Sequence, residues 1–105
     1  MLKIQFIKRP SPSTINMLAR RSQSLRSRNS EPVSSEAVGL VQGPLADMVA
    51  ACDIAEKTSG VMVEEIQGIC PQHFAMIAIF GDTSAVAVAL IAIGEKIDKK
   101  RPDID

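Results

Sequence analysis

The sequence predicts an α/β (α+β) fold in which a ferredoxin-like antiparallel sheet is flanked by helices. Short segments alternate apolar and polar residues with the period of a strand, and longer segments space apolar residues three and four apart, as helices do. From residue 37 onward these elements follow the order β-α-β-β-α, which lacks the last strand of the split β-α-β-β-α-β arrangement. A strand and helix at the N-terminus supply it in the predicted fold, which is therefore circularly permuted.

The 105 residues are enough for one domain with its own core, with the predicted order β-α-(linker)-β-α-β-β-α. Its parts are the permuted strand and helix (1–19), a flexible basic linker (20–36), the domain body (37–97) and a charged, exposed tail (98–105). The linker is rich in Ser and Arg and almost free of large apolar residues, so it cannot bury enough surface to order itself strongly.

The N-terminal strand is predicted over residues 2–8, where three apolar residues alternate with polar ones. The stretch "RPSPS" ends it. Ser11 and Pro12 then provide an N-cap and a first-turn proline, which predict a helix over residues 12–21.

The domain body begins with a short strand, "AVGLVQ" at 37–42, and Gly-Pro then opens a helix over 44–58. The apolar residues of this helix recur three and four apart, the spacing of a core-facing stripe: Leu45, Met48, Val49, Cys52 and Ala55. The spacing therefore predicts that Cys52 lies in the core.

Two further strands are predicted at 61–66 and 73–80, followed by a helix over 83–97 that Asp82 can cap. This last helix is apolar nearly all round. A helix without a polar face must be covered twice, by its own sheet and by something else, and the simplest second cover is another subunit.

Composition excludes several classes of protein. The chain has no Trp, no Tyr and only three Phe, so platforms for stacking bases are missing and we expect no nucleic-acid partner. The longest apolar run, residues 85–93, is far shorter than a membrane span, and the N-terminus lacks the apolar block of a signal peptide. We expect no membrane partner and a cytoplasmic protein with reduced thiols.

The net charge is zero, but the charges are unevenly distributed along the chain. Residues 1–30 contain basic residues and no acid, whereas residues 31–95 are strongly acidic with Lys57 as their one base. A basic arm on an acidic body is compatible with an anionic partner, and equally with a solvated segment that packs near the carboxylates of a neighbouring subunit.

The loop "GICPQHF", residues 68–74, carries one of the two cysteines, Cys70, beside the only histidine, His73. A turn between strands needs Gly, Asn or Asp for its geometry, and neither a thiol nor an imidazole. From the residues alone, Cys70 is either a metal ligand or an ordinary loop thiol. Glu64 and Glu65 point to opposite faces of one strand, and no catalytic constellation is found, so we do not expect an enzyme.

Residues 37–96 resemble the shell-protein domain of bacterial microcompartments (the BMC domain). The resemblance is carried by "AVGLVQGPLADMVAACDIAEKTSGVMV" and by "AIFGDTSAVAVAL". It implies hexamers that tile into a shell, with Lys57, four residues after Asp53, at the edge where hexamers meet. The Arg-Pro pair that follows the last strand in this family is matched by Arg9 and Pro10, which makes the order similar to the permuted branch. The resemblance implies that Arg9 also lies at the hexamer edge.

Within that branch, the loop Gly68, Ile69, Cys70, Pro71 and Gln72 resembles the Gly-x-Cys-Pro-Gln pore loop of shell proteins associated with glycyl-radical enzymes. The resemblance implies that Cys70 binds an iron–sulfur cluster, of the 4Fe–4S type, at the hexamer pore. One chain cannot hold such a cluster, because a cubane requires four thiolates. Six symmetric copies bring more thiols than are needed, and Pro71 stiffens the backbone after each one.

We therefore expect a structural shell subunit of a glycyl-radical-type microcompartment, located in the microcompartment shell. Its expected partners are its own copies in a homohexamer, other shell proteins, and encapsulated enzymes or redox carriers. A cluster in the pore would transfer electrons or be delivered across the shell. The alternative is a ferredoxin-like regulatory domain that binds a small ligand and forms a dimer or trimer.

Overall fold

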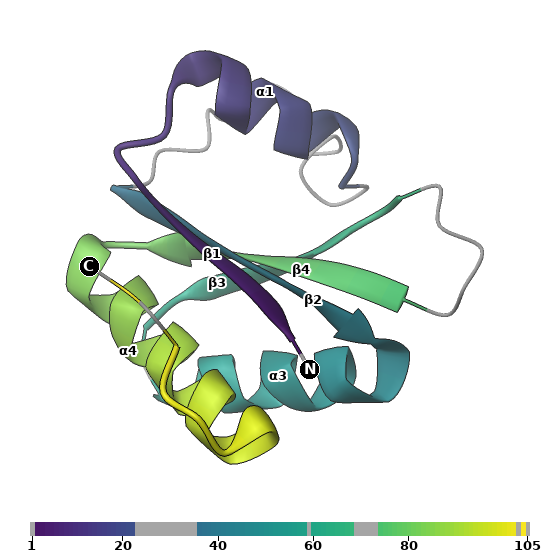
Figure 1. Ribbon diagram of the computed structural model, residues 1–105. Helices are drawn as coiled ribbons and strands as arrows, with labels where there is room; N and C mark the ends of the chain where they lie inside the picture. The colour runs from purple at the N-terminus through teal and green to yellow at the C-terminus, as the bar shows by residue number, and fades with distance from the viewer. Residues whose placement is uncertain (1, 23–35, 59, 69–73, 103, 105) are drawn as a thin grey trace.

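The computed structural model describes residues 2–22, 36–58, 60–68, 74–102 and 104, which form one sheet with helices on both faces (Figure 1). In chain order the elements are β1 (Lys3–Lys8), α1 (Pro12–Arg20), β2 (Ala37–Pro44), α3 (Leu45–Thr58), β3 (Met62–Ile66), β4 (Phe74–Gly81), α4 (Thr83–Ile93) and the π-helix η1 (Gly94–Asp98). Residues 23–35 of the predicted linker lie outside the described residues.

The four strands pair antiparallel in the order β1-β2-β4-β3. β1 lies at one edge beside β2, with Lys3 opposite Gln42 and Lys8 opposite Ala37. This is the place that the last strand of the split β-α-β-β-α-β arrangement would take after β4 and α4. The predicted fold class and the permuted order of its elements are confirmed.

Strand alternation divides the core between the two faces of the sheet. On one face, Val41 and Ile79 pack with the buried residues of α3 and α4, and on the other face, Val38 and Phe80 pack with Leu18 of α1. Figure 1 shows the same division, with α3 and α4 on one side of the sheet and α1 on the other. Fully burying each side chain of this size contributes about 1.5–3 kcal/mol, so both faces stabilise the fold.

The N-terminal helix α1 is defined by local signals at both ends. The Ser11 side chain accepts a hydrogen bond from the Thr14 N–H at 3.2 Å, and Pro12 occupies the first turn. After the helix, the carbonyl of Arg21 accepts from the N–H of Gln67 at 2.6 Å, which ties the helix end to the end of β3. The predicted N-cap is confirmed, and the helix ends one residue before the predicted boundary.

The helix α3 buries only part of the predicted stripe, Met48 and Ala55, together with Ala51, which the prediction did not include. Met48, Ala51 and Ala55 are buried against the sheet, whereas Leu45 and Val49 are 55% and 65% exposed. The prediction that Cys52 lies in the core is wrong: it is half-buried, because the small side chains of Ala51 and Ala55 are the ones that allow close approach to the sheet.

The predicted helix over 83–97 is observed as α4 followed by the π-helix η1. Asp82 caps it, accepting a hydrogen bond from the Ala85 N–H at 2.8 Å. After η1, Lys99 adopts a left-handed conformation with φ 54°, and the N–H of Lys100 donates to the carbonyl of Gly94 at 3.2 Å. The chain therefore reverses direction after η1. No helix among the described residues is long and apolar enough to cross a membrane.

The C-terminal residues are more ordered than the predicted exposed tail. Lys99, Lys100 and Arg101 are exposed, but Pro102 and Ile104 are half-buried, and Ile104 packs against the core. A Cβ on Gly94 would lie 2.5 Å from Cδ of Pro102, so the absence of a side chain on Gly94 allows this close packing.

Candidate functional site

The loop singled out in the sequence connects β3 and β4 at one end of the sheet. Its two strands pair with Ile66 opposite Met76, and β4 begins at Phe74, which faces Pro44 at the end of β2. The segment between β3 and β4 therefore leaves the sheet where β2 ends. The predicted pore-loop residues Ile69, Cys70, Pro71 and Gln72, and also His73, lie outside the described residues.

The described ends of this loop show how it is attached. Gln67 is bound to the carbonyl of Arg21, and Ile66 before it is 3% exposed, so the loop leaves a firmly held strand. Gly68 is exposed, and a Cβ there would meet no atom within 4 Å. The single chain thus gives no steric reason for glycine at this position. Phe74, on the other side of the loop, has an exposed ring.

Lys57 and Arg9 lie at the opposite end of the sheet from this loop. Lys57 is in the last turn of α3, which ends just before β3 begins at Met62, opposite Phe80. Arg9 follows β1, and its N–H donates to the carbonyl of Glu36 at 2.7 Å, just before β2 begins. An eight-residue strand spans about 24 Å, so the sheet separates both residues from the loop by most of its length.

The local geometry of Lys57 is that of a surface ion pair. Its Nζ lies 3.0 Å from Oδ2 of Asp53, one helical turn earlier, and the side chains are 74% and 61% exposed. Such a pair contributes about 0.3–0.5 kcal/mol. The structure therefore joins the two residues of the predicted Asp-x-x-x-Lys stretch, and leaves their charged ends accessible.

An iron–sulfur cluster cannot be built from the described side chains. No group of three or more His, Cys, Asp or Glu side chains is placed to hold a metal within the described ranges. Cys52 lies on α3, where burial first, and then the charges of Glu56 and Asp53, raise the pKa of its thiol. A thiol that is held protonated is a poor metal ligand.

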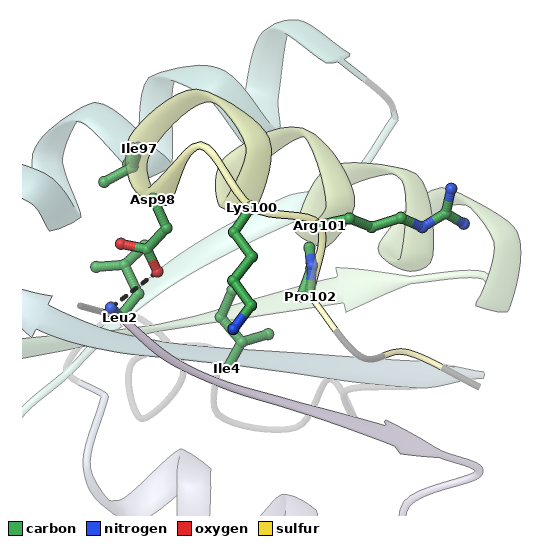
Figure 2. A pocket seen from close by; sticks show the side chains of 8 residues that line it. Leu2, Ile4, Ile97, Asp98, Lys100, Arg101 and Pro102 are labelled. Carbon is green, nitrogen blue, oxygen red and sulfur yellow. Dashed lines mark hydrogen bonds between the residues drawn. The ribbon is translucent and has the colours of Figure 1, made fainter.

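Two surface features were missed in the sequence. A groove of about 400 Å³ lies between α3 and the β3–β4 edge, and the exposed side of α3 forms its wall. A second pocket, of about 550 Å³, lies between the start of β1 and the C-terminal residues (Figure 2). The wide apolar arc of α3 was a signal for the groove, but nothing in the sequence indicated that the C-terminus would fold back.

The comparisons with known proteins agree with this architecture. The family model of the BMC domain matches residues 37–102. The ligand-free GrpU microcompartment shell protein from Clostridiales bacterium 1_7_47FAA is 35% identical with a TM-score of 0.69, and the match covers 93% of each chain. The GrpU protein from Pectobacterium wasabiae is 37% identical with a TM-score of 0.67, over 87% of this chain and 98% of that one.

A third solved structure is similar in fold alone. It is the fused permuted hexameric shell protein MSM0275 from the RMM microcompartment, which is 22% identical with a TM-score of 0.69. The match covers 91% of this chain and 45% of that chain. The comparison with curated proteins finds no match.

Proposed function

Because this chain belongs to the BMC domain family and is a microcompartment shell protein, we propose that it forms cyclic hexamers in the shell of a glycyl-radical-type microcompartment. The role of such a subunit is structural and not enzymatic. The finer assignment rests on the Gly-x-Cys-Pro-Gln loop at residues 68–72, whose likeness to glycyl-radical-associated shell proteins is a resemblance of sequence.

The observation that carries the proposal is the placement of the loop and the two edge residues at opposite ends of the sheet. In a ring whose axis passes the loop, Lys57 and Arg9 face outward. Their exposed charged ends are then available to neighbouring hexamers, where a long side chain packs its stem and finds carbonyl acceptors. The loop, in contrast, meets its own copies at the centre.

In this proposal, Cys70 thiols from several copies hold a 4Fe–4S cluster at the pore. Each chain contributes one loop thiol, so the site exists only in the ring, and a cluster with four thiolate ligands leaves two of six thiols free. Bound there, the cluster would supply one-electron transfer across the shell or be a cargo that passes through it. Pro71 fixes the backbone beside each thiol, which helps to hold the ligands near the axis.

The cluster is tested by purifying the protein under anaerobic conditions. We expect visible absorption and bound iron that are both lost in Cys70→Ser, while the oligomer, measured by native mass spectrometry, is retained. Cys52→Ser is the matched control and should keep its iron, because Cys52 belongs to the α3 groove. Iron retained in Cys70→Ser would rule out Cys70 as the anchor.

The hexamer is tested separately, by light scattering and by electron microscopy of the wild-type chain. Six subunits per particle and hexagonal sheets are expected. A stable dimer or trimer that forms no sheets would overturn the shell hexamer.

A further inference from the structure

The geometry points to a head-to-tail contact between copies of this chain, in which the basic tail of one copy docks into the acidic groove of the next. The basic tail is residues 99–102, and the acidic groove is the one between α3 and the β3–β4 edge. The inference rests on the proposed shell assembly and names the surfaces that build it.

The acidic groove has an apolar wall and a negatively charged rim. Its wall includes Leu45 and Val49, which are more than half exposed although they are large and apolar. Its rim carries Asp53, Glu56 and Glu65, all of them exposed. An exposed apolar strip bordered by charge is typical of a protein–protein contact.

The negative charge of the groove is only partly neutralised within the chain. Lys57 pairs with Asp53, but no Lys or Arg among the described residues lies within 4.0 Å of Glu56 or Glu65. Burial raises the pKa of the neighbouring Cys52 thiol, and the charges of Glu56 and Asp53 raise it further. The groove therefore presents a net negative field to any surface that covers it.

The basic tail carries three consecutive cations, Lys99, Lys100 and Arg101, between Asp98 and Asp103 of the sequence. Lys99, Lys100 and Arg101 are exposed, and none of them is within 4.0 Å of a carboxylate in the described part of the chain. The backbone beneath them is held by the hydrogen bond from Lys100 to Gly94 and by the packing of Pro102 on Gly94. An ordered segment loses little conformational entropy when it docks.

A further contact lies next to the tail, at the edge of the sheet. Figure 2 shows Asp98 accepting a hydrogen bond from the N–H of Leu2 at 3.0 Å, with Lys100 beside Ile4 and Arg101 pointing away. The residue before the tail, Asp98, is thereby attached to the start of β1.

The two surfaces lie on opposite edges of one sheet. α3 packs against β3 at one edge, and α4, which leads into the tail, packs against β1 at the other. A contact between the acidic groove and the basic tail thus leaves one unused surface on each end of a pair, which is the property of a heterologous contact that closes into a ring. A two-fold contact of groove with groove would instead oppose like charges.

The tail lies toward the end of the sheet that carries the loop, and the groove extends from that end along α3 to Glu56, near the end of the helix. Asp98, just before the tail, is bound to Leu2 at the start of β1, opposite the end of β2, and the groove is lined by Glu65 and Ala75, near the two ends of the loop. A ring with the loop at its axis brings these two flanks of neighbouring copies together. The contact is therefore compatible with the proposed pore.

The test exchanges the charges of the two surfaces. Glu56→Lys with Glu65→Lys makes the groove basic, and Lys100→Glu with Arg101→Glu makes the tail acidic. Each double variant alone is expected to lose the ring, with assembly shifted to at least about tenfold higher concentration, as judged by native mass spectrometry at low ionic strength. Mixed one to one, the two variants should restore rings in which they alternate, because each groove then meets a tail of opposite charge.

A matched control and a fourfold variant keep the test decisive. Arg20→Glu with Arg21→Glu makes the same charge change at the end of α1, on the other face of the sheet, and should keep the ring. A chain with all four groove and tail substitutions has exchanged charges and should assemble by itself.

The outcomes separate this inference from the proposed function. If the wild-type chain forms hexamers and both double variants do so at the same concentration, the docking of tail into groove is overturned while the shell hexamer stands. The docking is likewise overturned if mixing restores nothing and the fourfold variant is monomeric. If the wild-type chain forms no ring, the proposed function itself fails.

Discussion

At the scale of single residues, Cys52 shows how burial and nearby charges together set the pKa of a side chain. The sequence spacing predicted a core thiol, but the structure places it at the margin of α3, between apolar neighbours and two carboxylates. Burial disfavours the thiolate, and Glu56 and Asp53 disfavour it further, so the pKa of Cys52 lies above its ordinary value of 9.0. The thiol is therefore protonated and unreactive at neutral pH.

We expect this pKa to be visible in the rate of alkylation by iodoacetamide. In a Cys70→Ser chain that also carries Lys100→Glu and Arg101→Glu, which keep the groove open, the rate should rise with pH and reach half its maximum above pH 9.0. Glu56→Gln should move this midpoint to lower pH by removing a repulsive charge. Glu95→Gln, on the exposed side of η1, is the control and should leave it unchanged.

The raised pKa of Cys52 also makes the stability of the folded state depend on pH. A group whose pKa is raised on folding stabilises the folded state below its unfolded pKa, and this stabilisation is lost as the pH rises through the folded value. For Cys52 the loss falls above pH 9.0. An alkylation midpoint below pH 9.0 would contradict both statements.

At the scale of elements, the close contact between Gly94 and the tail determines where the C-terminal cations lie. A Cβ at Gly94 would lie 2.5 Å from Cδ of Pro102 and 2.9 Å from the carbonyl oxygen of Lys100. One of these atoms belongs to a proline ring and the other to the backbone, so neither can move alone. The tail must shift as a whole if residue 94 gains a side chain.

We expect Gly94→Ala to release the tail and to destabilise the fold by about 1–3 kcal/mol, the usual range for an overpacked contact. The measurements are the thermal midpoint and hydrogen exchange of the Lys100 N–H, which should lose its protection. Gly60→Ala is the matched control, since a Cβ there meets no atom within 4 Å, and its thermal midpoint should be unchanged or slightly raised. Equal midpoints for the two variants would show that the close contact is not a constraint.

The helix α3 also shows why apolar spacing in the sequence does not reveal which residues of a helix pack against the sheet. Its apolar residues cover a wide arc, of which only the part with Met48, Ala51 and Ala55 is buried. The alanines at 51 and 55 pack against the sheet because small side chains let the backbone approach it, which leaves the larger Leu45 and Val49 outside. On the proposed assembly, those larger residues are core residues of the oligomer.

At the scale of the whole molecule, the permuted connection leaves the contacts of the sheet unchanged. β1 completes the edge beside β2 from the N-terminal end of the chain, and the hydrogen bond between Leu2 and Asp98 places the start of β1 next to the end of η1. The order of segments in the chain and their order in the sheet are thus independent.

We therefore expect a re-permuted chain to fold to the same structure. In this variant, residues 36–104 are followed by a flexible Gly-Ser linker and residues 2–22, so that β1 is the last strand of the chain. Its circular dichroism and thermal midpoint should match those of the wild type within a few degrees, because only the connection is changed. A chain that fails to fold would mean that residues 23–35 contribute contacts of their own.

The sequence by itself determined the elements, their order and the permuted completion of the sheet, because strand alternation, helix caps and turn residues are local signals. It also identified the loop at 68–72 and the residues Lys57 and Arg9 through resemblance. Only the tertiary structure decided which stripe of α3 is buried, that the C-terminus folds back on Gly94, and that opposite charges lie on opposite edges of the sheet. These features depend on which side chains meet across elements distant in the sequence, and local periodicity carries no information about such contacts.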